Sequence, residues 1–133
     1  MREPRWVARL VVEAIHFDQL REHGGLPGLR DEGALDAALA RPRHKWTHRR
    51  KPDLEALAAA YAYGLARDHP FQDGNKRVAA VTMIVFLELN GRHVTAPEDE
   101  LVLILTGVAG GSVSEAALAR WLRRWTTGRA TSA

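Results

Sequence analysis

One stretch of nine residues brings together the side-chain types that phosphate chemistry needs. It covers residues 69–77 and reads His-Pro-Phe-Gln-Asp-Gly-Asn-Lys-Arg. His69 is the only residue in this stretch whose side chain exchanges a proton near neutral pH. Asp73 is a hard oxygen donor of the kind that Mg²⁺ accepts, and Mg²⁺ usually accompanies nucleotide phosphates. Lys76 and Arg77 are cationic donors suited to phosphoryl oxygens.

The elements around this stretch would place it at the start of a helix. It leads directly into Val78 to Leu89, a run that is apolar nearly all the way round a helical wheel, and such a helix is normally buried. Asn90 and Gly91 predict its end. At a helix N-terminus, free N–H groups and the positive end of the dipole favour a bound phosphate, and Gly74 allows it a close approach.

A purely structural interpretation of the same residues stays open. Asp73 can simply cap the helix, while His69, Lys76 and Arg77 occupy its exposed surroundings. For any one of these residues that explanation is the better one. For all of them within one turn, beside a Gly-Asn pair, we favour a site.

These residues resemble the signature of the Fic/Doc family, His-Pro-Phe-x-(Asp/Glu)-Gly-Asn-(Gly/Lys)-Arg, and every fixed position matches. Fic enzymes usually carry glycine at the position of Lys76, and lysine there is similar to the death-on-curing (Doc) branch. The segment from Gly24 to Pro42 also resembles the N-terminal half of Doc-type proteins. The resemblance therefore covers most of the chain.

The resemblance implies a transferase that uses ATP and Mg²⁺. His69 would be the general base for a target hydroxyl, a role typically worth ~10²–10⁴ in rate. Asp73 would hold Mg²⁺ against the phosphates. The implied phosphate ligands come from the signature and from the helix before it, and they are Gly74, Asn75, Lys76, Arg77 and Arg67. Arg67 has an equally good explanation as a complement to its helix dipole.

Lys76 is the sole basis for choosing the product. Fic enzymes with glycine there transfer AMP, whereas Doc-type proteins take the nucleotide in the reversed sense and transfer the γ-phosphate. The resemblance thus implies a protein kinase whose target is a translation factor, a threonine of elongation factor Tu, with AMP transfer as the alternative. Val78 stands where the family often has threonine, and Val81 where some Doc proteins have asparagine. If that asparagine contacts nucleotide, weaker activity or another target follows.

Regulation is also implied by the family. Many Fic proteins inhibit themselves through (Ser/Thr)-x-x-x-Glu-(Gly/Asn). In this sequence a glutamate is followed by Gly or Asn only at Glu32, and the residue four positions earlier is Gly28. The motif is therefore missing, and we expect a separate small antitoxin protein that folds on this chain.

The most basic segment runs from Arg41 to Lys51 and allows three interpretations. It could bind nucleic acid, with its basic residues on the phosphate backbone and Trp46 stacked on a base. The chain would then be a non-enzymatic nucleic-acid-binding module, which is the alternative to an enzyme. It could be an ordinary solvated loop. By resemblance to Fic proteins, it could be a flap beside the active site that docks the target polypeptide. We favour the flap, formed by Arg43, Lys45, Trp46, Arg49 and Arg50.

Length and composition agree with one globular domain. The chain has 133 residues, of which 46% are hydrophobic and 26% charged, and it has no cysteine for a disulfide or a thiolate metal site. The net charge of +3 favours an acidic partner only weakly. No apolar run reaches the ~20 residues that span a bilayer, and no signal-peptide core is recognised at the start. We expect a cytoplasmic protein that binds neither membrane nor, in the favoured interpretation, nucleic acid.

The remaining pattern predicts an all-α fold, a helical bundle around the buried central helix. Expected helices run from Trp6 to about His23, from a cap at Asp31 to Arg41-Pro42, and from Pro52-Asp53 to about Asp68. A short extended piece at 92–94 follows the central helix. Pro97 starts another helix that Gly110-Gly111 ends, and a last one begins at Ser112 or Ser114, where Ser112 with Glu115 fits a capping box. Residues 1–125 would form the domain and residues 126–133 a frayed tail.

Overall fold

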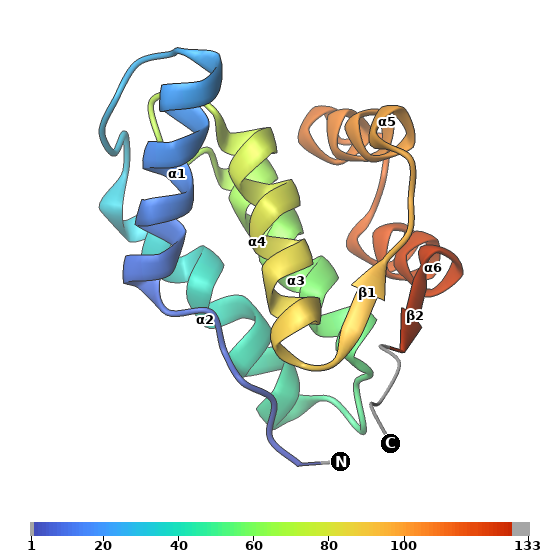
Figure 1. The fold of residues 1–133 in the computed structure, drawn as a ribbon. Coiled ribbons are helices and arrows are strands. Elements are labelled where there is room, and N and C mark those ends of the chain that lie inside the picture. The colour runs from blue at the N-terminus through green and yellow to red at the C-terminus, as the bar shows by residue number, and fades with distance from the viewer. Residues whose placement is uncertain (1, 129–133) are drawn as a thin grey trace.

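The fold is all-α, as expected, and a computed structural model describes it for residues 2–128. Six helices and a pair of three-residue strands make up this part of the chain (Figure 1). In chain order they are α1 (Arg9–His23), α2 (Glu32–His48), α3 (Leu54–Asp68), α4 (Asn75–Leu89), β1 (Arg92–Val94), α5 (Glu98–Gly110), α6 (Glu115–Trp125) and β2 (Thr126–Gly128).

The centre of the bundle is α3, and not the helix after the signature. Ten of the fifteen residues of α3 are buried, and it packs against α2, α4, α5 and α6. Its alanines keep the helix thin enough for neighbours on every side. The expectation of α4 as the buried centre was wrong, because α4 keeps a half-exposed apolar stripe that includes Val81, Ile84 and Val85. Figure 1 shows α4 in front of α3, with α1 and α5 on either side.

The second helix continues past the proline that was expected to end it. Pro42 lies inside α2 and is buried. A proline in a helix interior removes one backbone hydrogen bond and crowds the preceding turn. Tertiary contacts hold the helix together beyond it, because Glu115 at the start of α6 accepts hydrogen bonds and ion pairs from Arg41 (2.7 Å) and from Lys45.

The C-terminal helix begins at the second of the two candidate serines. The Ser114 hydroxyl accepts a hydrogen bond from the Ala117 N–H at 3.1 Å, whereas the Ser112 hydroxyl donates to the Gly107 carbonyl. The capping box between Ser112 and Glu115 is therefore not formed. Burial opposes ionisation of Glu115, but the hydrogen bonds from Lys45 and Arg41 outweigh it and lower the pKa of its carboxyl.

The expected tail begins with a strand. Residues 126–128 form β2, which pairs antiparallel with β1 so that Val94 lies opposite Thr126. Arg92 of β1 donates to the Glu55 carboxylate at 2.8 Å, and Glu55 is 6% exposed. This pairing fixes the end of α6 against α3. The rest of the expected tail, residues 129–133, lies outside the described residues.

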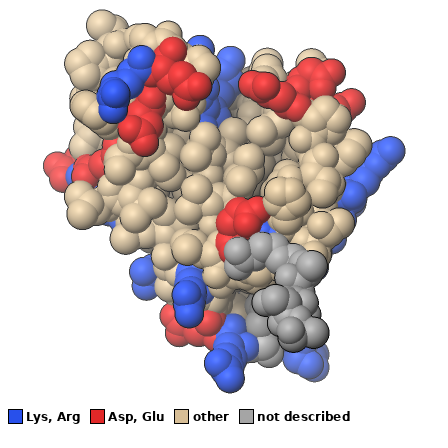
Figure 2. Space-filling model, viewed as in Figure 1, with Lys and Arg blue, Asp and Glu red and all other residues tan. Residues whose placement is uncertain are grey.

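The charges on one face of the molecule are concentrated at its edges. Figure 2 shows mostly uncharged side chains over the middle of this face, with acidic side chains at the upper right over the start of α5. These are the acidic residues of the first turn of α5, Glu98, Asp99 and Glu100. Within residues 2–128, no helix has the length and apolar character needed to cross a bilayer.

Close packing between α2 and α3 generates a prediction at Gly64. A Cβ at this position would lie 3.0 Å from the Ala38 Cα, a backbone atom that cannot move without displacing α2. Gly64→Ala should gain about 1 kcal/mol in helix propensity. Crowding should cost more, so the free energy of unfolding should fall by about 1–2 kcal/mol in urea titrations. Gly110→Ala is the control, because a Cβ there meets nothing within 4 Å. Equal stability of the two variants would contradict the packing argument.

Candidate active site

His69 lies at the junction where α3 ends. It is the residue after the last turn of α3 and has the left-handed backbone conformation φ 47°, ψ 59°. Its side chain is exposed, whereas the next two residues, Pro70 and Phe71, are buried. The chain thus anchors two apolar residues in the core and leaves the histidine facing solvent, where a substrate hydroxyl could reach it.

The loop of residues 69–74 is held by the loop that joins α1 to α2. The Pro70 carbonyl accepts hydrogen bonds from the N–H groups of Arg30 (2.8 Å) and Asp31 (3.0 Å), and Gln72 N–H donates to the Gly28 carbonyl at 3.0 Å. Leu29 and Phe71 form an antiparallel bridge between the two loops. Figure 1 shows the two loops at the same end of the molecule, next to the start of α4.

The Asn75 side chain fastens the loop from within. Its amide nitrogen donates to the Phe71 carbonyl and its amide oxygen accepts from the Phe71 N–H, both at 3.0 Å. These bonds hold the side chain against Phe71, while the backbone N–H of Asn75 remains at the start of α4 for a contact with phosphate. Asn75 therefore shapes the loop that was expected to bind phosphate.

A histidine on α1 supports the same loop. The ring of His16 stacks on Phe71 with centroids 3.9 Å apart, and its Nε2 lies 3.0 Å from the Asp73 carbonyl. Because a carbonyl oxygen only accepts, Nε2 carries the hydrogen of this bond. His16 is 6% exposed, so it acts as a buried support of this loop and not as a second base.

The Asp73 carboxylate lies at the start of α4 and is exposed. One oxygen accepts from the Gly74 N–H at 3.0 Å and the other from the Leu26 N–H at 3.3 Å. Gly25 makes this approach possible, because its φ is +124° and a Cβ there would lie 3.0 Å from the carboxylate. The carboxylate is therefore held in place but still open to solvent on one side.

Asp73 alone suits a metal ion that arrives with its substrate. Among the described residues, no group of three or more His, Cys, Asp or Glu side chains could hold a metal ion. Mg²⁺ commonly takes only one or two carboxylates and completes its shell with phosphate oxygens and water. The donor set at Asp73 fits Mg²⁺ bound to a nucleotide, and it does not fit a resident metal held by protein alone.

The N-terminus of α4 is open to an anion. Gly74 precedes the helix with φ 80°, and the N–H groups of residues 75–77 have no carbonyl partner within the helix. The first turn contains no acidic residue, while Lys76 and Arg77 are exposed on it, and among the described residues neither makes an ion pair. This combination of free N–H groups, dipole and two cations is suited to phosphate.

Comparison with known proteins identifies the family. Residues 6–87, more than half of the chain, match the sequence profile described as the Fic/DOC family. The chain belongs to the Fic/DOC family. It is also similar to two curated Fic/Doc proteins. One is "Protein kinase doc" of Escherichia phage P1, 35% identical over 111 residues that cover 84% of this chain and 87% of the relative. The other is "Toxin Doc" of Mycolicibacterium smegmatis, 43% identical over 77 residues that cover 57% and 59%.

The Arg67 side chain contacts the end of α5 in this Fic/Doc domain. Its guanidinium lies 3.5 Å from the Ala109 carbonyl and 2.7 Å from where a Cβ of Gly111 would be, at the C-terminal end of α5. A cation at the negative end of a helix dipole is stabilising. Of the two expected roles, the observed contacts correspond to dipole complementation, although with α5 and not with its own helix; a contact with phosphate stays a prediction.

Most of the expected docking flap is helical in this Fic/Doc domain. Residues 43–48 are the last turns of α2 and not a loop, and they lead to the start of α3, whereas His69 follows its end. The start of α3 and His69 are about 22 Å apart, the length of a fifteen-residue helix. The last turns of α2 run back alongside α3, because a Cβ at Gly64 would lie 3.4 Å from Arg41. Residues 43–48 are therefore helical and not a loop, Arg49 and Arg50 lie in the connection to α3, and a role of this segment in docking a target stays a prediction.

The flap residues have structural contacts of their own. Arg43 lies over the Trp6 ring at 5.3 Å, Lys45 pairs with Glu115, and Trp46 packs against the core. A surface groove of about 990 Å³ runs here between α2 and α6. It is lined mostly by α2, and the lining cations and histidines are Arg41, His44, Lys45, His48 and Arg49. Arg50 is exposed.

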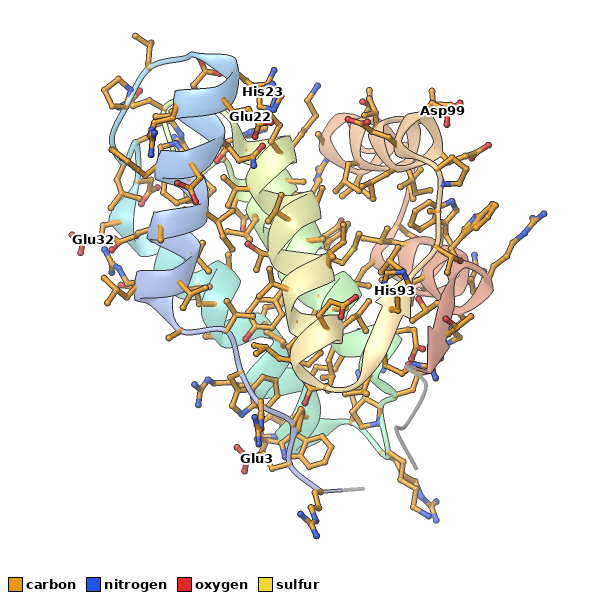
Figure 3. The ribbon with its side chains drawn as sticks, in the orientation of Figure 1. Glu3, Glu22, His23, Glu32, His93 and Asp99 are labelled. Atoms are coloured by element: carbon orange, nitrogen blue, oxygen red, sulfur yellow. The ribbon has the colours of Figure 1, made fainter. Side chains whose placement is uncertain are left out.

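Two supports of the Fic/Doc site were not predicted, His16 and Arg30. Each is separated from the signature by at least 39 positions in the chain, and their local sequence patterns gave no signal. Two further histidines lie elsewhere: Figure 3 shows His23 at the end of α1 and His93 on β1. Each has a glutamate partner, Glu22 at 3.9 Å and Glu88 at 2.6 Å.

His16→Phe tests the support of the loop. The ring stack on Phe71 should survive, but the Asp73 carbonyl should lose its donor in a partly buried place. We expect the free energy of unfolding to fall by about 1–3 kcal/mol, measured by urea titration. His23→Phe, at an exposed position on the same helix, should stay within about 0.5 kcal/mol of the unmodified chain. A His16→Phe protein as stable as this control would show that the hydrogen bond has no supporting role.

Proposed function

We propose that this chain is a Doc-type toxin that acts as a protein kinase. It would transfer the γ-phosphate of ATP to a hydroxyl of a translation factor, a threonine of elongation factor Tu, and so arrest translation. The observation that carries the proposal is the exposed His69 held beside the open N-terminus of α4. The similarity to proteins named "Protein kinase doc" and "Toxin Doc" supports it.

His69 supplies the base in this proposal. A ring nitrogen takes the proton from the acceptor hydroxyl while the hydroxyl oxygen forms a bond to the γ-phosphorus. The bond from that phosphorus to the β,γ-bridging oxygen breaks, and ADP leaves with the electron pair. The role suits an exposed side chain on a fixed backbone, because the acceptor must approach from solvent. A general base of this kind is worth ~10²–10⁴ in rate.

Residues 73–77 would stabilise the negative charge of the transferred phosphoryl group. Transfer of a phosphoryl group depends mostly on positioning and on electrostatic stabilisation. Asp73 would hold Mg²⁺, which neutralises phosphate charge when bound. The N–H groups at the start of α4 would donate to phosphoryl oxygens, together with the side chains of Lys76 and Arg77. Gly74 leaves the backbone accessible, and Asn75 keeps the loop in shape through Phe71.

Lys76 favours phosphoryl transfer over AMP transfer. It lies in the first turn of α4 and is exposed, in the place where phosphates approach backbone N–H groups most closely. Its side chain fills space that a glycine would leave and adds a charge there. Val78 and Val81, the two departures from the family pattern, lie further along the helix. Val78 is fully buried, so it contributes to the core and not to the nucleotide site.

The proposal includes a partner that restrains the toxin. A kinase that arrests translation would be harmful to its own cell, and the sequence lacks the family's inhibitory glutamate motif. We therefore include a small antitoxin protein that folds on this chain. Bacterial growth would test for this partner. The chain expressed alone should arrest a bacterial culture, and co-expression of the antitoxin should relieve the arrest.

Replacement of His69 tests the catalytic assignment. His69→Ala should abolish modification of elongation factor Tu in a translation extract supplied with ATP, because the proton acceptor is lost. Intact-protein mass spectrometry reads the product, an added mass of about 80 Da for a phosphoryl group or about 329 Da for AMP. His93→Ala, an exposed histidine on β1, is the control and should leave the rate unchanged. Unchanged turnover in a folded His69→Ala protein would refute the assignment.

Replacement of Lys76 tests the choice of product. Lys76→Gly should lose phosphoryl transfer and gain AMP transfer, because it removes a donor and opens space at the start of α4. The helix should survive, since glycine in a helix costs about 1 kcal/mol. Lys76→Gln separates charge from space: it should lose phosphoryl transfer without gaining AMP transfer. If Lys76→Gly phosphorylates as fast as the unmodified chain, Lys76 does not select the product.

A further inference from the structure

Three consecutive carbonyls at the end of α3 are bound from one place. The Arg30 guanidinium donates from Nη2 to the Asp68 carbonyl at 2.7 Å and from Nε to the His69 carbonyl at 2.6 Å. The backbone N–H groups of Arg30 and Asp31 donate to the Pro70 carbonyl. The backbone on both sides of the His69 side chain is therefore fixed by the loop before α2.

The backbone of His69 needs such a support. Its φ of 47° lies in the left-handed region, where residues other than glycine are uncommon. It also precedes Pro70, and a residue before proline favours an extended conformation. A residue held in a sparsely populated conformation costs about 1–3 kcal/mol and persists only where its surroundings impose it. Here the surroundings that contact its carbonyl and the preceding one belong to Arg30.

Pro70 removes the usual way of closing this helix end. When a helix ends on a left-handed residue, the N–H of the next residue commonly bonds back to a carbonyl of the last turn. Proline has no N–H, so this bond cannot form after His69. The last carbonyls of α3 then need another donor. The Arg30 side chain provides one for the last of them, the Asp68 carbonyl, across 38 positions of the chain.

The shape of the side chain suits the task. A guanidinium presents several N–H donors in a rigid planar fork, so it can bind two neighbouring oxygens at once. Lysine offers a point charge on a flexible stem and cannot hold two carbonyls in a fixed relation. Arg30 is exposed, yet among the described residues it makes no ion pair. Its bonds to the end of α3 are the side-chain interactions that the structure gives it.

We propose that Arg30 is a positioning residue for His69. Its guanidinium holds the left-handed turn at the end of α3, and this turn aims the His69 side chain at the acceptor hydroxyl. The inference rests on the proposed role of His69 as the base. It assigns a functional role to the loop between α1 and α2, which does not itself carry a catalytic group.

The first test reads the backbone directly and needs no substrate. The ¹³Cα and ¹³Cβ chemical shifts of His69 report whether its backbone is left-handed or extended. In Arg30→Gln they should move towards extended values, while those of His93 stay unchanged. Arg120→Gln, which removes the same charge from an exposed position on α6, should leave the His69 shifts as they are. Unmoved His69 shifts in Arg30→Gln would overturn the proposal.

The second test reads turnover, with either transfer product counted. Arg30→Gln should lower kcat by about 10–100-fold and leave the KM for ATP within about 2-fold, because a misaimed group slows chemistry more than binding. Arg30→Lys keeps the charge and one donor, so its kcat should lie between the two. Arg120→Gln should match the unmodified chain. An unchanged kcat, or a raised KM with kcat intact, would overturn the positioning role.

A double variant connects the effect to the helix end. Pro70→Ala supplies the missing N–H, so the loss of kcat caused by Arg30→Gln should be several-fold smaller in a Pro70→Ala background. An equal loss in both backgrounds would overturn the assignment of helix closure to Arg30. Failure of the proposed function is distinguishable, because it would appear as no turnover in the unmodified chain or as full turnover in His69→Ala. The chemical-shift test of Arg30 needs no turnover and still tests the support of the His69 backbone.

Discussion

The hydrogen-bonded pairing of residues 28–31 with residues 70–72 is the contact on which the site depends. Buried helices approach the site from both sides, and six residues, 69–74, must connect them within one tight loop. Buried backbone groups need partners, and those of this loop bond mostly to residues outside it. The carbonyls of residues 68–70 and the N–H of Gln72 find theirs in the segment that joins α1 to α2. The chemistry of residues 69–77 thus depends on a segment forty residues earlier.

This dependence explains why the first two helices are part of the site without contributing a reacting group. From the middle of α1 comes His16, which stacks on Phe71, and from the loop after α1 comes Gly25, which makes room for the Asp73 carboxylate. From the start of α2 comes Asp31, whose side chain caps that helix while its N–H binds Pro70. Each contact limits the movement of the loop. A loop with restricted movement can keep a base and a phosphate site at a fixed distance and orientation.

Local signals in the sequence were sufficient for much of the fold. Asp31 and Asp53 were expected to start helices, and each accepts a hydrogen bond from the N–H three residues later. Pro42 was misread because a proline ends a helix by local rules, whereas the ion pairs of Arg41 and Lys45 with Glu115 support this one from outside. The same Glu115 was expected to close a capping box, and the ion pairs occupy it instead.

The site was predicted in its chemistry and only partly in its geometry. Residue types and spacing in 69–77 pointed to a phosphate site at a helix start, and α4 does begin there. The apolar run of α4 predicted that this helix is the buried centre, but an apolar helix can also keep a half-exposed stripe. The alanine-rich α3 is the more buried helix and lies at the centre of the bundle. His16 and Arg30 could not be predicted, because their partners are 57 and 39 positions away and no local pattern records such contacts.

The central claim is that nucleotide phosphates bind at the start of α4. Titration of the ¹⁵N-labelled protein with ATP and Mg²⁺, followed by amide chemical shifts, tests it most directly. The account predicts the largest shifts at the amides of residues 74–77, with smaller ones at residues 25–30, which hold that loop. Shifts concentrated instead at the basic end of α2 and at residues 49–51, with residues 74–77 unmoved, would contradict it.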